Sequence, residues 1–174
     1  TYTNNSASTI TAANLTLTAQ AQTKIYDGDK SVSNGSAYAV NGLIANESIS
    51  SVSLLYVDQN FGIGNKTIAI SSAVAGANTS LGNYNLIYVN NTTSTIQKAN
   101  LTLTAGDQTK TYDGTTAADG SVYNVTGIMS NESIASVTML YSNKDAGIGN
   151  KIITISGAIA GTNTILTNYN ITYV

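Results

Sequence analysis

The chain has 174 residues and a net charge of −2, with seven lysines, nine acidic residues, and no cysteine, histidine or proline. So few positive charges argue against a nucleic-acid-binding surface, which needs clustered Lys and Arg to neutralise phosphates. The lack of cysteine excludes disulfides and thiol chemistry, and no apolar run approaches the roughly 20 residues that would span a bilayer, so we expect no membrane insertion.

The composition favours strands and turns over helices. Thr, Val, Ile and Tyr favour strands, whereas Asn, Gly, Ser and Asp favour turns, and these residues dominate the sequence. Few Lys and Glu residues are left to support exposed helices, so we expect a neutral surface rich in hydroxyl and amide groups. Such a surface is typical of secreted bacterial fibres.

Most of the sequence occurs twice. Asn14–Ala19 returns 86 positions later as Asn100–Ala105, and Asn83–Asn85 returns 85 positions later as Asn168–Asn170. A fixed period of this length indicates tandem domains. The same offset of 86 relates the two copies of a Lys-x-Tyr-Asp-Gly motif, made of Lys24, Tyr26, Asp27 and Gly28 and of Lys110, Tyr112, Asp113 and Gly114.

The repeats set the expected domain boundaries. Residues 1–12 align with residues 87–98, so we interpret them as the tail strand of a preceding repeat. The first repeat is then 13–98 and the second 99–174, with the C-terminal hairpin strand of the second one missing. No Gly/Ser tract separates the repeats, so we expect adjacent domains to be held close together. We also expect residues 1–12 either to pair with a neighbouring molecule's Tyr169–Val174 strand or to be disordered.

The sequence of the first copy predicts a series of short strands. Period-two alternation of apolar residues predicts strands over Asn14–Ala19, Ser51–Val57 and Tyr84–Val89. Shorter strands are expected at Lys24–Tyr26, Ser36–Val40, Lys66–Ser71, extended by Ala73–Ala75 after a bulge, and Ser94–Gln97, which forms a hairpin with the strand before it.

Turns and one helix-like piece separate these strands. Asp-Gly is a strong turn signal because Gly accepts a positive φ, and we expect Gly62–Asn65 to turn as well. Gly42–Ile49 is the only helix-like piece, with two turns at most. Short strands at regular spacing predict an all-β fold of two tandem Ig-like β-sandwich repeats. The alternative is a β-grasp-like sheet packed on a helix at Leu43–Ile49.

The combined motifs resemble the YDG/MBG-type repeat domains of large bacterial surface adhesins, the filamentous-haemagglutinin-like proteins. The resemblance rests on Lys-x-Tyr-Asp-Gly after an alternating Leu-Thr strand, Gly-x-Gly-Asn-Lys, and Asn-Tyr-Asn, and it covers both repeats. It implies a secreted or cell-surface location and a structural stalk that projects a distal binding region. Carbohydrate or mucin binding is implied for relatives. A third alternative is a filament subunit that polymerises by strand exchange.

The residues offer little for catalysis. Without His, Cys or Arg, no Ser-His-Asp or Cys-His arrangement and no His/Cys zinc site can be built, so we predict no enzyme and no cofactor. Asp27 and Asp113 could bind calcium or sugar, but turn residues with the same pattern bond nearby backbone N–H groups. The recurring tyrosines suit either a sugar platform or a bulky core.

Three further residue types recur or fit a modification motif. Glu47 and Glu132 lie in Asn-Glu-Ser, where we expect them to cap or hydrogen-bond a short helical turn. Lys24 and Lys110 are candidates for an isopeptide bond with a neighbouring Asn. Among many Asn-x-Ser/Thr sequons, the exposed-turn sites Asn34 and Asn90 are the candidate N-glycosylation acceptors. The expected partners are neighbouring repeats of the same array or filament and host or matrix glycans.

Overall fold

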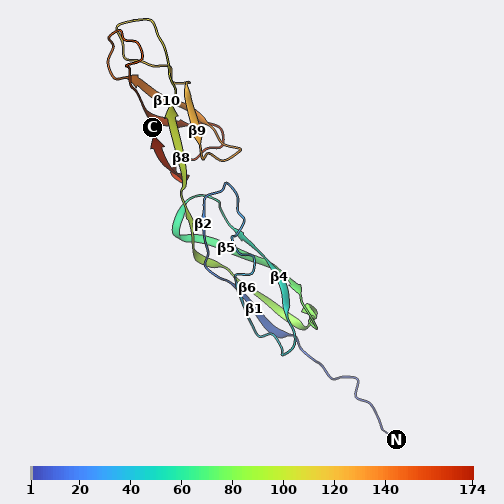
Figure 1. Cartoon of the computed structure of the whole chain (residues 1–174). Coiled ribbons are helices and arrows are strands. Elements are labelled where there is room, and N and C mark those ends of the chain that lie inside the picture. The colour runs from blue at the N-terminus through green and yellow to red at the C-terminus, as the bar shows by residue number, and fades with distance from the viewer. Residues whose placement is uncertain (1) are drawn as a thin grey trace. The chain divides into compact units, whose positions relative to one another are not determined.

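The computed structural model describes residues 2–174, which form an all-β chain in two compact units (Figure 1). Unit 1 holds the chain up to Lys24 and from Asp29 to Ile96. Unit 2 holds Ile25–Gly28 together with Gln97–Val174. The Tyr-Asp-Gly segment of the first repeat therefore belongs to unit 2.

Unit 1 is built on two sheets with strand orders β3-β1-β6 and β2-β7-β5-β4. Every strand predicted for the first copy is there. Their bounds are β1 Ala13–Ala19, β2 Thr23–Ile25, β3 Tyr38–Asn41, β4 Ile49–Tyr56, β5 Gly62–Ala75, β6 Tyr84–Val89 and β7 Asn91–Gln97.

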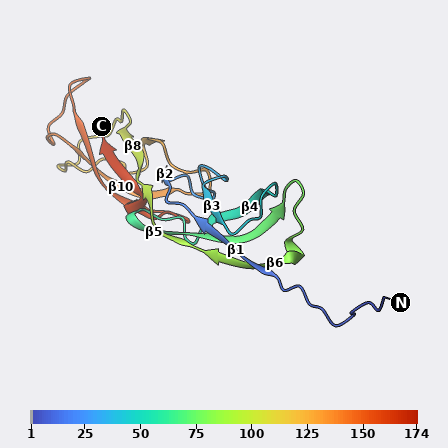
Figure 2. The ribbon, with the colours of Figure 1, turned by 90° about the horizontal axis from the view of Figure 1, so that it is seen from below.

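The first sheet of unit 1 has β1 at its centre. β1 pairs parallel with β6, with Leu15 opposite Leu86, and antiparallel with β3, with Leu17 opposite Val40. Figures 1 and 2 both show β1 and β6 side by side. Leu15 and Leu17 are fully buried, as expected for the apolar face of an alternating strand.

The second sheet corrects two predictions. β7 does not form a hairpin with β6: it lies in the other sheet and pairs with β5, with Ser94 opposite Lys66. This crossing buries Ser94 and Ile96, which are 1% and 0% exposed. The expected turn at Gly62–Asn65 is also wrong, because pairing with β7 makes that segment the start of β5. The predicted bulge before Ala73 is confirmed by a register shift in the β4–β5 pair.

Unit 2 repeats the first sheet and only part of the second. Its sheets have the orders β12-β8-β9 and β10-β11, and among the described residues no strand corresponds to β7. Its core contains Leu103, Val137, Met139 and Ile155. The strand bounds are β8 Ala99–Ala105, β9 Tyr123–Thr126, β10 Ile134–Tyr141, β11 Ile153–Ala160 and β12 Tyr169–Tyr173.

The helix-like prediction for Gly42–Ile49 is wrong. That segment makes a tight turn in which the Glu47 N–H donates to the Ile44 carbonyl at 3.2 Å and Asn46 has φ 70°. The only helical pieces in residues 2–174 are 3₁₀ turns, η1 at Leu81–Asn83 and η2 at Leu166–Asn168. Within this range no helix covers a sheet, as the β-grasp alternative would require.

A glycine holds the same place in both units. Gly42 has φ 95° and Gly127 has φ 90°, a region that side chains rarely adopt. A Cβ at Gly42 would lie 2.2 Å from the Asn14 carbonyl oxygen, and one at Gly127 would lie 2.2 Å from that of Asn100. The close approach of the first strand in each repeat therefore demands glycine there.

Residues 2–12 form no strand and are exposed along their whole length. Figures 1 and 2 show this segment extending away from the strands of unit 1. Ile10 is 100% exposed, whereas its repeat equivalent Ile96 is 0% exposed in β7. The segment thus has the sequence pattern of β7 without a sheet to pair with.

Candidate functional site

The Lys-x-Tyr-Asp-Gly motif forms a turn in both copies. Gly28 has φ 81° and Gly114 has φ 77°, the left-handed conformation that glycine adopts without strain. Asp27 and Asp113 are both exposed. The two tyrosines differ sharply, because Tyr26 is 3% exposed and Tyr112 is 60% exposed.

In each motif the lysine holds the turn together through oxygen atoms. In unit 1 the Lys24 ammonium donates to the carbonyl oxygen of Asp29 at 2.9 Å and to its Oδ1 at 3.1 Å. In unit 2 the Lys110 ammonium donates to Asp113 Oδ1 and to the Thr115 carbonyl oxygen, both at 2.9 Å. Each lysine amino group therefore serves the fold of its own turn, and the isopeptide bond stays a prediction.

The carboxylates of these turns are stabilised in their charged form. Hydrogen bonds from Ser31, followed by Lys24, lower the pKa of Asp29 to about 2. Lys110 and then Thr115 lower the pKa of Asp113 to about 2. Among residues 2–174, no group of three or more acidic side chains could hold a metal ion. The described residues therefore offer no set of acidic ligands that would support calcium binding at Asp27 and Asp113.

Tyr26 is the centre of a cluster of polar side chains inside unit 2. Its hydroxyl donates to Glu132 Oε1 in a short hydrogen bond, and Glu132 Oε2 accepts a second bond from the Tyr169 hydroxyl at 2.6 Å. The rings of Tyr26 and Tyr169 meet edge to face, with their centroids 5.5 Å apart. This is a favoured geometry for aromatic pairs. One carboxylate thus binds two tyrosines.

Burial makes this cluster electrostatically unusual. Burial and the hydrogen bond to Glu132 raise the pKa of Tyr26 to about 12, although a hydrogen bond from Asn168 acts in the opposite direction. The same two causes raise the pKa of Tyr169 well above its ordinary value. Both hydroxyls therefore stay protonated and donate to the carboxylate at neutral pH.

The predicted capping role of the glutamates is wrong. Glu47 accepts a short hydrogen bond from the Tyr84 hydroxyl, as Glu132 does from Tyr169. The backbone N–H of Ile44 donates to the Tyr84 hydroxyl at 3.1 Å. Glu47 therefore fixes a core tyrosine, since residues 42–49 form no helical turn for it to cap. The sequence signal is that Asn-Glu-Ser and Asn-Tyr-Asn recur together in both repeats.

Two of the other recurring tyrosines, Tyr56 and Tyr141, also have a core role. The Tyr56 hydroxyl donates to the carbonyl oxygens of Gln22 and Thr95, both at 3.2 Å. The Lys24 ammonium lies 5.4 Å from the Tyr56 ring centroid, within cation–π range. The fully or nearly buried tyrosines are Tyr26, Tyr56, Tyr84, Tyr141 and Tyr169.

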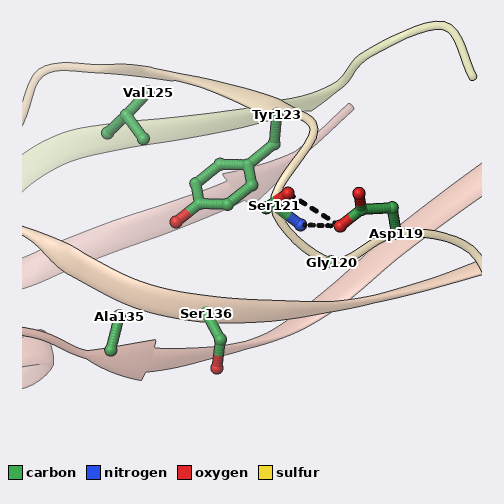
Figure 3. Close-up of a pocket in the computed structure, with 7 residues that line it drawn as sticks. All are labelled: Asp119, Gly120, Ser121, Tyr123, Val125, Ala135 and Ser136. Carbon is green, nitrogen blue, oxygen red and sulfur yellow. Dashed lines mark hydrogen bonds between the residues drawn. The ribbon is translucent and has the colours of Figure 1, made fainter.

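Unit 2 also has a shallow depression beside β9 and β10, shown in Figure 3. Tyr123 and Asp119 are among its lining residues. The Tyr123 hydroxyl donates to the Ile134 carbonyl at 3.2 Å, and Asp119 Oδ1 accepts from the backbone N–H and hydroxyl of Ser121 at 2.9 and 2.7 Å. These Ser121 bonds lower the pKa of Asp119, so it is a poor general base.

The two candidate glycosylation sites lie on exposed loops of unit 1. Asn34 Oδ1 accepts from the Ser36 N–H at 2.9 Å, and Asn90 Oδ1 accepts from the Ile70 N–H at 3.1 Å. Both side-chain carbonyls therefore stabilise the fold. Nothing in these contacts bears on modification at the amide nitrogen, so glycosylation of Asn34 and Asn90 stays a prediction.

Comparison with known proteins yields one family. No curated protein and no solved structure matches the chain. No part of residues 2–174 forms a helix of the length and apolarity needed to cross a membrane. A family model described as the YDG domain matches residues 11–95 and again residues 97–174. The two matches cover nearly the whole sequence, and the chain therefore belongs to the YDG domain family.

Proposed function

We propose that the chain is a structural repeat pair from the stalk of a secreted bacterial adhesin or extracellular fibre, located at the cell surface, which projects a distal binding region. The observation that carries this proposal is the direct succession of strands. β7 ends at Gln97 and β8 begins at Ala99, so a single residue joins a strand of one repeat to the first strand of the next. A joint that short restricts bending in a way that flexible linkers do not.

The remaining composition is consistent with a mechanical role. The chain lacks His, Cys and Arg. The carboxylates described above already accept hydrogen bonds within turns or from tyrosine hydroxyls. We therefore propose that it is not an enzyme. We also propose that the two repeats are tandem Ig-like β-sandwiches, each built from two facing sheets.

Small-angle X-ray scattering on chains of two, four and six repeats tests the stalk proposal. A stalk requires the maximum dimension to grow in proportion to repeat number. A dimension that grows only as the square root of repeat number, as flexible chains do, would contradict it. The longer chains are made by joining Val174 of one copy to Asn4 of the next, which keeps the repeat register because Asn4 corresponds to Asn90.

A second candidate function is carbohydrate binding at the depression of Figure 3, where an aromatic ring lies beside hydroxyl groups. It is less well supported because the polar atoms of Tyr123 and Asp119 already bond to the protein. Screening the chain and its Ser136→Trp variant against immobilised glycans tests it. Binding that the bulky side chain abolishes would favour this function over a purely structural one.

The third candidate, a filament formed by strand exchange, is favoured by the exposed β7-like segment, in which Ile10 is 100% exposed. Native mass spectrometry over increasing protein concentration tests it. Head-to-tail oligomers of the intact chain that disappear in an Ile10→Asp variant would support it. A monomer at all concentrations would leave the stalk proposal in place and remove this one.

A further inference from the structure

The cluster around Tyr26 has a counterpart in unit 1 that lacks a third tyrosine. Glu47 and Tyr84 are bonded as Glu132 and Tyr169 are, and the hydroxyl of each tyrosine accepts a backbone N–H, from Ile44 at 3.1 Å and from Met129 at 3.2 Å. We call the side chains of Ile44, Glu47, Asn83 and Tyr84 the unit 1 socket, and those of Met129, Glu132, Asn168 and Tyr169 the unit 2 socket.

The two sockets differ in what their glutamate binds. Glu132 accepts a tyrosine hydroxyl at each carboxylate oxygen, with Tyr26 on Oε1 and Tyr169 on Oε2. Over residues 2–174, Glu47 accepts only the Tyr84 hydroxyl, through Oε2. The unit 1 socket therefore keeps one charged acceptor oxygen in the position that Tyr26 uses in unit 2.

The asparagines of the two sockets differ in their exposure to solvent. Asn168 is 0% exposed, whereas its equivalent Asn83 is exposed. The causes of the raised tyrosine pKa values are consistent with this difference in burial. Burial is the main cause of the raised pKa of Tyr169, whereas the hydrogen bond to Glu47 is the main cause of the raised pKa of Tyr84. The unit 1 socket is thus the same structure without the covering that the Tyr-Asp-Gly turn provides.

The second Tyr-Asp-Gly turn carries a tyrosine that is exposed, whereas the tyrosine of the first turn is buried. Tyr112 is 60% exposed, and its described contact is with the Lys144 ammonium, 6.0 Å from the ring centroid. The turn itself is already formed, with Gly114 at φ 77° against 81° for Gly28. An exposed aromatic ring on a pre-formed turn loses little conformational entropy when it docks.

We propose that the unit 1 socket binds the Tyr-Asp-Gly turn of a second copy of this chain, with the Tyr112 hydroxyl donating to Glu47 and its ring against Tyr84. The motif is then a docking element that joins one YDG domain to the next. This proposal rests on the stalk function and names the residues that would join consecutive domains of the stalk. Its recognition chemistry is a buried tyrosine–carboxylate hydrogen bond, which is stronger than a bond between neutral groups.

Acetylation of tyrosines with N-acetylimidazole, located by mass spectrometry, tests the proposal in two copies fused from Val174 to Asn4. Tyr112 of the first copy should react at least about tenfold more slowly than Tyr112 of the second copy, because docking leaves it accessible only through local opening. Tyr26 in both copies reports that the fusion is folded. Equal reactivity of the two Tyr112 residues would overturn the proposal.

A matched pair of variants tests the acceptor. Glu47→Gln in the second copy should restore the reactivity of Tyr112 in the first copy, whereas Glu47→Gln in the first copy should leave it protected. If both variants behave alike, Glu47 is not the acceptor and the proposal fails. The stalk function is judged separately, by the scattering dimension of the same fusion. Fast reaction of both Tyr112 residues in an extended particle would refute docking alone.

Disulfide trapping needs no fusion. A Cβ on Gly28 would lie 3.6 Å from Met129 Cβ, within the range for a disulfide. Gly28→Cys with Met129→Cys should therefore crosslink within one chain. The equivalent pair, Gly114→Cys with Ile44→Cys, should give a ladder of multimers on oxidation at high protein concentration. A crosslinked first pair without a ladder from the second pair would overturn the proposal.

Discussion

β5 in unit 1 and β11 in unit 2 come from nearly the same sequence but differ in extent. β5 covers 14 residues and β11 covers 8. Both copies carry Gly-Ile-Gly-Asn-Lys, at Gly62–Lys66 and Gly147–Lys151. This segment is a strand only in unit 1, where β7 pairs with it. The comparison shows that the partner strand, more than local propensity, determines whether this sequence becomes a strand.

The turn of the Lys-x-Tyr-Asp-Gly motif also differs between the two units. Lys24 is 8% exposed, whereas Lys110 is exposed. In unit 1 the strand β2 precedes the turn and lies next to β7, but Thr109–Thr111 forms no strand in unit 2. β7 therefore organises two of its neighbours, β2 and the start of β5.

Removing the buried side chain of β7 should have the largest effect. Ile96→Ala should destabilise unit 1 by about 2–5 kcal/mol, as large-to-small core substitutions do, because Ile96 is 0% exposed. Thermal unfolding followed by circular dichroism measures this. Ile10→Ala is the matched control, since Ile10 is its fully exposed repeat equivalent, and it should leave the melting temperature unchanged. Equal effects of the two substitutions would contradict the different burial of Ile96 and Ile10.

Adding a β7 to unit 2 should make it resemble unit 1. A copy of residues 90–97 placed after Val174 should stabilise unit 2 by about 2–3 kcal/mol from burial of its isoleucine alone, with ladder hydrogen bonds in addition. For a domain of this size that corresponds to a rise of roughly 8–24 °C in melting temperature. The same extension with Asp in place of that isoleucine is the control, and equal melting of both extensions would refute the idea.

High pH should separate the two units through the tyrosine cluster. The folded-state pKa of Tyr26 is raised from 10.0 to about 12, so its contribution to stability is complete below pH 10 and is lost as the pH rises through 12. Two pKa units correspond to about 3 kcal/mol. The free energy of unfolding of unit 2, from urea titrations at several pH values, should therefore fall across this range, and should fall less in a Tyr26→Phe variant.

At neutral pH, Tyr26→Phe should have the smallest effect of these changes. It removes the donor from Glu132 Oε1 and should cost about 2 kcal/mol, a typical value for a hydrogen bond to a charged group. Tyr112→Phe is the matched control in the other copy of the motif and should change the stability by less than about 0.5 kcal/mol, as exposed substitutions do. A larger loss from Tyr112→Phe than from Tyr26→Phe would contradict the described cluster.

Much of the fold could be predicted from alternation in the sequence. The apolar residues of Asn14–Ala19 and Ser51–Val57 define strands with one buried face, and the structure confirms both. Alternation also predicts β7 as a strand, but it does not predict which strand β7 pairs with. Ser94 and Ile96 alternate with polar residues in a way that suits either sheet, and the parallel pairing of β6 with β1 decides which sheet β7 joins.

The site was predictable only in part. Asp-Gly predicted the turn, because its glycine tolerates positive φ. The different burial of Tyr26 and Tyr112 could not be predicted, since both lie in the same motif. What separates them is a contact with Glu132 and Tyr169 over 100 residues away along the chain. The helix predicted for Gly42–Ile49 is absent, because the chain turns at Asn46, which has φ 70°, and Glu47 accepts a hydrogen bond from the Tyr84 hydroxyl.

Hydrogen–deuterium exchange on the unmodified chain tests directly whether β7 determines the difference between the units. Peptides covering 62–66 and 147–151 can be compared directly, because their sequences are the same. We expect strong protection at 62–66, where β7 is paired, and exchange close to that of an unstructured peptide at 147–151. Equal protection of the two segments would contradict it.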